Sequence, residues 1–556
     1  MDLQIPQLKA HVKDDFSTDP DAVRQWVADL PLVNTDRTAE LLQGALTAMN
    51  TLQVPIYERF EDLEHLADPI RCVVDTLKKQ YLRKRFPLDE KTLLRASLHT
   101  SLCMKMATGY KIVAAERDKN RKGDTLFEQA IHNAILYLGE TLLGYYSIYA
   151  PYPTGIWQDL HGLYDLATRH GIADGTSSGK LSPVHGMRTI ANAYKQNLLM
   201  SLACPYRMRQ SEISSVYALL IEWASHCRLH TAGEAGASGY FACHLDSDTP
   251  PRYLHNDQRD ALKSRWLIID TRDLEEPVRA TITKRQASTA RLSTLPEEAV
   301  LQRLMLSWGM MPKRQFPRRD NTSRPLVRLV NGLAAIHESL ESAAATTRSA
   351  KPATEEETVK EGQYLRDPTF ERVTTIETRP ADKASDNNPF MGAYSPGSRT
   401  GDKTPRIETW KMHDMSDGGY CLLWDNTETS HAHVGELVAI SEGEGEWHLG
   451  VIRWMRFTPR EGLALGMQML SPDARPVWAS VRKEQAGMED RMHGILLPGI
   501  AAMGQSATLL LPPMPFHTGC LSTLGEAGSE KTIRLTGQIE DTGSFAQFHY
   551  TEEKPG

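Results

Sequence analysis

The sequence has few long apolar runs and no paired cysteine motif. No apolar run approaches the roughly 20 residues that a membrane-spanning helix needs, and the polar N-terminus (1–16) lacks the pattern of a signal peptide. The seven cysteines are scattered and form no Cys-x-x-Cys pair, which favours free thiols in a reducing compartment. We therefore expect a cytoplasmic protein without a transmembrane segment.

An excess of positive charge is also absent. The 63 Lys and Arg residues are outnumbered by 70 Asp and Glu residues, giving a net charge of -7, so broad binding to DNA is not expected. Ser177-Ser178-Gly179-Lys180 lacks the full phosphate-loop pattern. His431-Ala432-His433 has metal-like spacing but no accompanying ligand cluster and is interpreted as a turn. The sequence predicts no catalytic residue, no metal site and no cofactor, and an enzyme hidden in the N-terminal half has no supporting motif.

At 556 residues the chain is too long for one core. Residues 1–230 are predicted to form a helical domain, with Asp89 and Ser211 as N-caps. Trp157, Leu160 and Leu163 are typical of a tetratricopeptide repeat, but no period of about 34 residues follows, which favours a bundle. The apolar spacing predicts these helices: Leu93–Ala115, Leu126–Tyr149, Trp157–Arg169, Met187–Ala203 and Ser211–His226.

The remaining chain divides into three expected parts. Residues 231–310 are predicted to be a small mixed α/β segment, 311–480 a β-barrel domain and 481–556 a further β unit. The composition of 340–405 indicates a disordered insertion within the barrel domain. Short strands separated by turn residues are expected in the barrel at Pro325–His337, Ile407–His413, Tyr420–Trp424, Leu437–Ser441, Trp447–Phe457 and Leu463–Met469.

Two short stretches have the chemistry of a nucleotide site. Arg314 and Arg318 lie four residues apart, and an arginine fork suits both phosphate oxygens and the O6/N7 edge of guanine. About a hundred residues later, Asp414 can accept hydrogen bonds from the guanine N1/N2 edge. Ser416 can add a hydrogen bond, and Gly419 permits close backbone approach.

The Arg-x-x-x-Arg segment followed by Asp-x-Ser-x-x-Gly in a barrel context resembles the PilZ-domain family of cyclic di-GMP receptors. The resemblance covers about 310–340 and 405–480. It implies a multidomain α+β protein: an N-terminal helical bundle, a PilZ-like six-stranded antiparallel β-barrel and a further C-terminal β unit. It also implies cyclic di-GMP as ligand, with Arg314 and Arg318 as the phosphate and guanine clamp and Asp414, Ser416 and Gly419 as barrel contacts.

Three further residues are weaker candidates for the same site. Lys313 and Arg319 flank the clamp and either add charge or are solvated surface residues. Trp454 either packs on a guanine or belongs to the barrel core or surface. The family resemblance suggests a role in bacterial motility, surface polysaccharide or biofilm control, through an unidentified protein partner that contacts the helical domain.

The insertion at 340–405 departs from the family pattern. A long surface loop adds little closure entropy, so a barrel split by the insertion can still close. In the alternative, the first strand is Arg406–His413, and Arg399-x-x-x-Lys403 replaces the clamp. The insertion also leaves open a second function, a ligand-free scaffold with a degenerate barrel that binds a protein constitutively.

Overall fold

The structure is a computed structural model that forms two compact units. One comprises Met1–Met311 with Arg456–Thr458, and the other Pro312–Met455 with Pro459–Gly556. The residues that the structure describes are 3–10, 16–119, 125–177, 188–232, 234, 239–254, 262, 265–287, 297–309, 319–320, 325–350, 406–416, 418–443, 446–471, 473–481, 491–499, 506–526 and 529–553. Within these ranges no helix is both long and apolar enough to cross a membrane.

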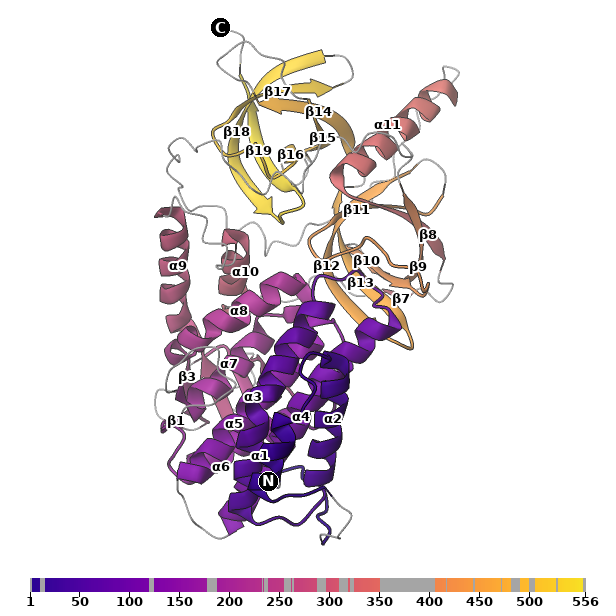
Figure 1. The fold of residues 1–556 in the computed structure, drawn as a ribbon. Helices are drawn as coiled ribbons and strands as arrows, with labels where there is room; N and C mark the ends of the chain where they lie inside the picture. Colours follow the sequence, from indigo (N-terminus) through magenta and orange to yellow (C-terminus); the bar gives the residue numbers. More distant parts are fainter. Residues whose placement is uncertain are drawn as a thin grey trace. The chain divides into compact units, whose positions relative to one another are not determined.

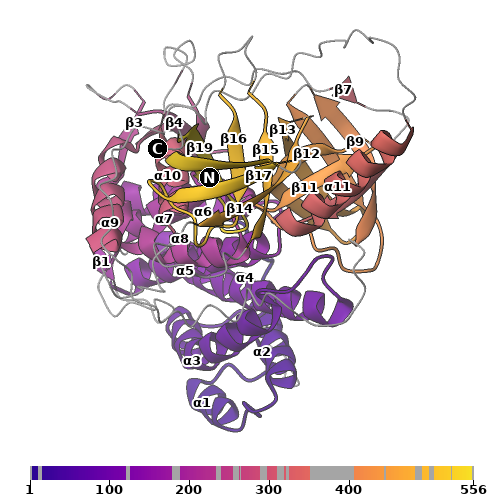
Figure 2. The same ribbon diagram turned by 90° about the horizontal axis from the view of Figure 1, so that it is seen from above.

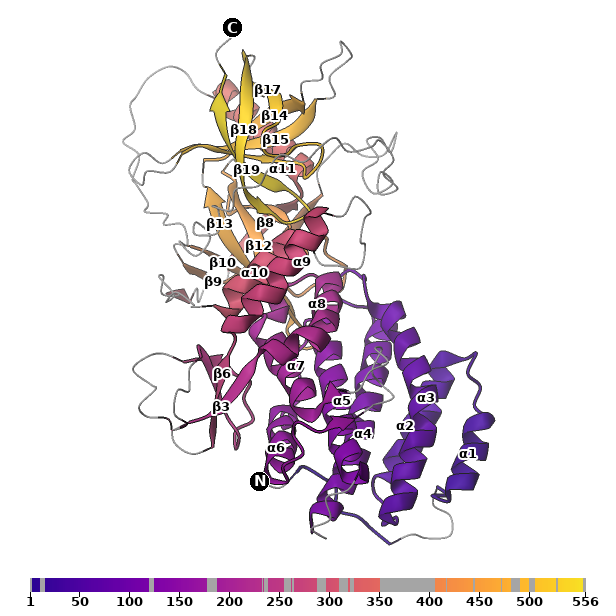
Figure 3. The same ribbon diagram turned by 90° about the vertical axis from the view of Figure 1, so that its left-hand side faces the viewer.

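The first unit is mainly helical, as the sequence predicts (Figure 1). Helices α1 to α5 lie side by side (Figure 3). The helices up to residue 230 are α1 (Pro20–Ala28), α2 (Thr35–Met49), α3 (Ile56–Tyr81), α4 (Glu90–Lys119), α5 (Thr125–Ser147), α6 (Ile156–Arg169), α7 (Ile190–Leu202) and α8 (Gln210–Trp223).

Helix α5 is the centre of this unit because it is buried on every side. It contacts α4, α6, α7 and α8, and its buried residues cover all faces of the helix rather than one stripe. Gly139 is needed for this packing, because a Cβ there would lie 2.4 Å from the Tyr217 hydroxyl. A central helix of this kind fits a bundle.

The helix ends show where side chains cap the backbone. Asp89 is confirmed as a cap for α4, since its Oδ1 accepts a hydrogen bond from the Thr92 amide at 2.8 Å. The prediction for Ser211 is wrong, because α8 begins at Gln210 and its N-cap is Arg209. There the Glu212 carboxylate accepts from the Arg209 amide at 2.9 Å. A glutamate in the first turn thus takes the place of the expected serine.

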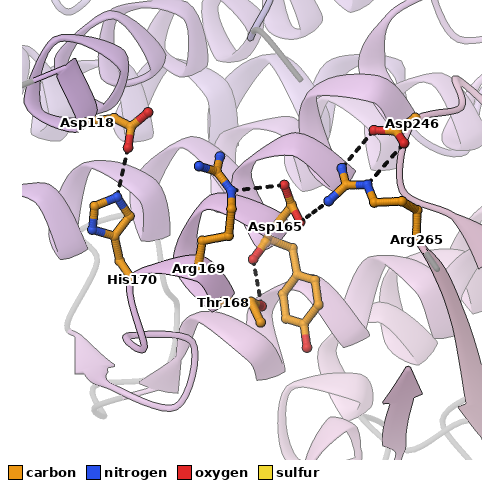
Figure 4. A network of polar contacts seen from close by, with 8 residues as sticks. Asp118, Asp165, Thr168, Arg169, His170, Asp246 and Arg265 are labelled. Carbon is orange, nitrogen blue, oxygen red and sulfur yellow. Dashed lines mark hydrogen bonds and ion pairs between the residues drawn. The ribbon is translucent and has the colours of Figure 1, made fainter. Parts of the chain in front are cut away.

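A small antiparallel sheet completes the first unit. Its strand order is β3 (Arg228–Thr231), β6 (Trp266–Asp270), β4 (Phe241–His244) and β5 (Arg252–Tyr253), and α9 (Glu275–Ala287) and α10 (Glu298–Trp308) follow. Arg265, just before β6, joins the sheet to α6 (Figure 4). Its guanidinium lies 2.5 Å from the Asp165 carboxylate and 2.7 Å from that of Asp246, so one fork holds two carboxylates.

The second unit contains two closed six-stranded antiparallel barrels. The order around the middle barrel is β10 (Gly419–Trp424), β13 (Gly462–Ser471), β12 (His448–Thr458), β11 (Leu437–Ser441), β8 (Leu326–Asn331) and β9 (Ile407–Ser416). Pairing of β9 with β10 closes it. The short strand β7 (Arg319–Asp320) pairs with the end of β9.

The middle barrel closes across the insertion. Strand β8 precedes residues 340–405, yet it pairs with β9 on one side and β11 on the other. The alternative in which Arg406–His413 is the first strand is therefore wrong. Alternation along β9 sends Trp410 and Met412 into the core. Glu408 lies on the same side, and its carboxylate accepts from Ser430 Oγ at 2.7 Å.

Strand β8 is shorter than the sequence predicts. Pro325–His337 was expected to be one strand, but it ends at Asn331, and Gly332 (φ 89°) turns the chain into α11 (Leu333–Ala350). Leu333, Ile336 and Leu340 have helical spacing and join one core cluster with residues of β11, β12, β15 and β16. The strand-like alternation of residues before Gly332 led to the prediction of a longer strand, although the spacing becomes helical after this residue. Helix α11 contacts β8, β11, β14 and β15, and Figure 2 shows it beside β11. The predicted disordered insertion at 340–405 is therefore wrong for residues 340–350, which are helical, and 351–405 lie outside the described residues.

The second barrel has the order β14 (Arg475–Val481), β15 (Met492–Leu497), β16 (Thr508–Leu511), β19 (Ala546–Glu552), β18 (Ser529–Asp541) and β17 (Leu521–Glu526). Pairing of β14 with β17 closes it. Its core includes Val477, Leu509, Leu535 and Phe548. Strand β14 contains residue 480, so the second barrel begins a few residues before the domain boundary that the sequence predicts there.

Candidate ligand-binding site

The arginine segment leads directly to the Asp-x-Ser strand. Lys313, Arg314 and Arg318 lie outside the described residues. The next residue along the chain, Arg319, begins β7, where it pairs with Met415 of β9, and Asp320 pairs with Asp414. Paired Cα atoms in an antiparallel ladder are about 5 Å apart, so the end of the arginine segment lies at the Asp-x-Ser strand. Arg319, the residue that follows the Arg-x-x-x-Arg motif, therefore lies beside the Asp-x-Ser strand.

A β-bulge decides which way Asp414 and Ser416 point. Along β9 the pairing passes from Met412 to Asp414, while β10 advances by one residue, so His413 is an extra residue in the ladder. Without the bulge, alternation would turn Asp414 toward the core together with Met412. Beyond it, Asp414 lies opposite Cys421, on the side away from the core. Ser416 lies opposite Gly419 and has the same orientation.

The close packing of β10 against β13 requires a glycine at position 419. Its φ angle is 154°, and a Cβ at this position would lie only 1.9 Å from the carbonyl oxygen of Met467 on β13. The backbones of β10 and β13 are therefore too close for any side chain here. This requirement comes from the neighbouring strand, and the close approach of a ligand to Gly419 stays a prediction.

Trp454 belongs to the outer surface of the barrel. Cys421 of β10 pairs with both Asp414 and Gly466, so these three positions form one row across β9, β10 and β13. A Cβ on Gly466 would lie 1.9 Å from Trp454 Nε1, so the indole lies directly over this glycine. The half-buried Trp454 thus extends the row onto β12. Between the core and the surface of the barrel, the structure places Trp454 on the surface, and packing on a guanine stays a prediction.

We call this row, with Ser416 and the adjacent His413, the outer-face row: His413, Asp414, Ser416, Cys421, Gly466 and Trp454. Sequence reasoning missed His413, Cys421 and Gly466. The only sequence feature that could have identified His413 is its position next to Asp414. The alternating pattern before it does not indicate a bulge. Cys421 and Gly466 join the row through cross-strand register, which has no local pattern.

Charged contacts surround the row. His413 Nδ1 is 3.9 Å from Asp414 Oδ2. Asp414 itself is buried to 7% exposure, whereas the side chain of His413 is 47% exposed. The row therefore combines a fixed acceptor, an adaptable imidazole and an aromatic surface.

The row is also connected to the second barrel. Arg453, next to Trp454, donates from Nε to Gln468 Oε1 at 2.7 Å. Its two terminal nitrogens bind the Glu540 carboxylate of β18, one of them at 2.9 Å. This bidentate pair is largely buried, with side-chain exposures of 19% and 11%. It joins the strand that carries Trp454 to a strand of the other barrel.

Comparisons with known proteins match the three parts of the chain in order. Family models match residues 21–235 as "Cyclic-di-GMP receptor FimW, N-terminal domain", 240–476 as its "middle PilZ domain" and 477–553 as "FimW C-terminal beta-barrel domain". The cyclic-di-GMP receptor FimW of Pseudomonas aeruginosa is 28% identical over 568 aligned residues, which cover 96% of this chain and 91% of that protein. No solved structure matches the chain.

Proposed function

From the membership of this chain in the PilZ-domain family of cyclic di-GMP receptors, we propose that it binds cyclic di-GMP on the outer face of the middle barrel. The observation that carries this proposal is the pairing of Arg319 with Met415, between Asp414 and Ser416. It places Arg319, the residue directly after the Arg-x-x-x-Arg motif, beside the strand that holds the acceptor groups. A ligand with two phosphates and two guanines needs both kinds of group at one place.

Arg314 and Arg318 are assigned to the phosphates and to a guanine O6/N7 edge. Asp414 accepts from the N1/N2 edge of a guanine, and Ser416 adds a hydrogen bond. The orientation of Asp414 and Ser416 toward the outer face, imposed by the bulge at His413, supports these roles. Gly419 supports them indirectly, because it keeps β10 close to β13 and leaves the surface beside Ser416 free of a side chain.

Three residues are assigned supporting roles. Lys313 and Arg319 add positive charge beside the phosphates, and Trp454 offers an aromatic face for a guanine. The position of Trp454 over Gly466, in the same cross-strand row as Asp414, supports this assignment. The indole is only half-buried, so part of its surface is accessible to a base.

The proposed output is a protein contact rather than a reaction. Ligand binding orders the arginine segment against β9, and the helical domain contacts a protein partner in response, a population shift driven by differential affinity. The family resemblance suggests bacterial motility, surface polysaccharide or biofilm control, in the cytoplasm. The ligand-free scaffold loses its main support, since the insertion does not prevent closure of the middle barrel.

Isothermal titration of the full chain with cyclic di-GMP tests the proposal. Arg314→Ala and Asp414→Asn should each weaken binding at least tenfold, about 1.4 kcal/mol, as expected for the loss of a charge-assisted hydrogen bond. Arg475→Ala and Asp473→Asn are matched controls, since both side chains are more than half exposed and lie outside the outer-face row. Equal losses in the controls, or no heat from folded wild-type protein, would reject the assigned site.

A further inference from the structure

Three metal-ligating side chains converge in the outer-face row. They are His413, Asp414 and Cys421, and one ligand atom of each lies within 4.8 Å of the other two. The residues come from two strands, β9 and β10, and no short sequence pattern links them. Imidazole nitrogen, carboxylate oxygen and thiolate sulfur are the three donors that proteins use for Zn²⁺.

The bulge explains why the three side chains meet. In a regular strand, His413 and Asp414 would point to opposite faces of the barrel. At a bulge two residues oppose one residue on the partner strand, and here His413 and Asp414 share Cys421 as that residue. A histidine and a carboxylate adjacent in sequence can therefore both reach the sulfur across the ladder.

The geometry needs only a small adjustment. Bond lengths of about 2.0–2.3 Å place the ligands of a tetrahedral zinc ion roughly 3.3–3.8 Å apart, and His413 Nδ1 is already 3.9 Å from Asp414 Oδ2. The imidazole can rotate, since its side chain is 47% exposed. Cys421 is half-buried and Asp414 is buried, so two ligands are held while the third adapts.

We propose that His413, Asp414 and Cys421 form a site for a zinc-like divalent cation on the outer face of the middle barrel. One thiolate and one carboxylate balance the charge of the ion, and the Cys421 thiol releases its proton to solvent on binding. Three protein ligands leave the fourth position for water. The sequence alone predicts no metal site, so this proposal rests on the fold.

The site bears on nucleotide binding because Asp414 belongs to both. A cation held by Asp414 withdraws the carboxylate from the guanine N1/N2 edge, so metal and cyclic di-GMP compete. This consequence rests on the proposed function, whereas metal binding itself does not. The two ideas therefore fail separately: one by lack of a metal signal, the other by lack of nucleotide binding.

Cobalt titration of the full-length, metal-stripped and reduced chain tests the site. A tetrahedral Co²⁺ thiolate site gives a ligand-to-metal charge-transfer band and intense visible bands, and we expect both at one equivalent, with displacement by Zn²⁺. Cys421→Ser should abolish the charge-transfer band, and His413→Ala should weaken Co²⁺ binding at least tenfold. Cys72→Ser, which changes an exposed cysteine of α3, should leave both unchanged.

The controls keep the outcome decisive. Cys421 points away from the core, so the serine variant should retain the wild-type far-UV circular dichroism. Absence of the bands from folded wild-type protein, or their persistence in Cys421→Ser, overturns the site. If the bands behave as expected, saturating Zn²⁺ should weaken cyclic di-GMP binding at least tenfold in wild type and have no effect in Cys421→Ser. Unchanged nucleotide affinity in the wild type overturns the competition.

Discussion

The two barrels of the second unit share a closed six-stranded antiparallel architecture but differ in their surfaces. In the middle barrel, one bulge at His413 turns Asp414 outward beside Cys421, Gly466 and Trp454. In the second barrel, irregularities lie in β18, within Leu535–Glu540, where Glu540 meets Arg453. Two barrels with the same architecture thus carry different surface groups. The middle barrel has the outer-face row, and the second barrel has Glu540, whose carboxylate binds Arg453 of the middle barrel. The local strand register, rather than the barrel architecture, decides which functional side chains lie on the outer face.

The largest expected effect is a loss of stability on replacing a glycine of the middle barrel, compared with a glycine of the second barrel. Gly419→Ala would place a Cβ 1.9 Å from the Met467 carbonyl oxygen, at a φ of 154°, and should destabilise the protein by about 3 kcal/mol. Gly525→Ala in β17 meets nothing closer than 3.8 Å and should change stability by less than about 0.5 kcal/mol. Chemical denaturation measures both, and equal effects would contradict the close approach of β10 and β13.

The contact between the barrels should be stronger than an ion pair within one barrel. Arg453→Met removes the bidentate pair with Glu540 and should cost about 2 kcal/mol. Lys531→Met removes a pair with Glu552 whose side chains are at least half exposed, and should destabilise the protein far less because water screens an exposed pair. A double-mutant cycle with Glu540→Gln isolates the pair. A coupling near zero would show that Arg453 does not join the barrels.

A buried carboxyl group in the helical unit makes the stability of the protein depend on pH. Burial, reinforced by Glu58, raises the pKa of Asp62 to about 7, and neither carboxylate oxygen has a hydrogen-bond partner among the described residues. The folded state therefore keeps a proton that the unfolded chain loses above about pH 4, so stability falls as pH rises from about 4 to 7. Asp62→Asn should remove this loss.

Thermal unfolding of Asp62→Asn at several pH values checks the effect. The variant should be more stable than wild type by about 1–2 kcal/mol at pH 8. This is less than the free energy that corresponds to the whole pKa shift, because the protein and water rearrange around a buried charge and lower its cost. The difference should vanish near pH 4. Asp68→Asn, on the same helix but exposed and paired with Arg71, is the control. A pH-independent difference would contradict the raised pKa.

The smallest expected effect concerns the aromatic surface. Trp454→Ala should weaken cyclic di-GMP binding three- to tenfold, about 1 kcal/mol, through loss of stacking. Trp454→Phe should retain most of the affinity, because it keeps an aromatic face over Gly466. Calorimetric titration of both variants measures their affinities for cyclic di-GMP, and the comparison isolates the contribution of the aromatic ring. Equal affinity of the alanine variant and wild type would remove Trp454 from the site.

The sequence predicted what depends on local pattern. Helical spacing located α4 to α8, and the alternation of Trp410 and Met412 predicted β9. The two motifs predicted a PilZ domain, which the family models confirm, although the helical region at 21–235, unrecognised from sequence, also matches that family. Helix α9 was missed because its polar composition shows little amphipathic pattern.

Other features depend on contacts between distant residues. The bulge at His413 arises from register with β10, and the closeness of Gly466 to Trp454 arises from packing of β12 on β13. Neither leaves a periodic signal in the chain. The change from β8 to α11 occurs at a single residue, Gly332, so one continuous strand was the simpler interpretation. Cross-strand register is the information that the sequence pattern lacks.

Calorimetric titration of cyclic di-GMP into wild type and Asp414→Asn, with Asp473→Asn beside them, tests the central claim most directly. Asp414 and Ser416 face outward because of the bulge at His413, so we expect saturable binding by wild type and by Asp473→Asn. Affinity should fall at least tenfold in Asp414→Asn alone. Undiminished affinity in folded Asp414→Asn would contradict the claim that the outer-face row binds the ligand.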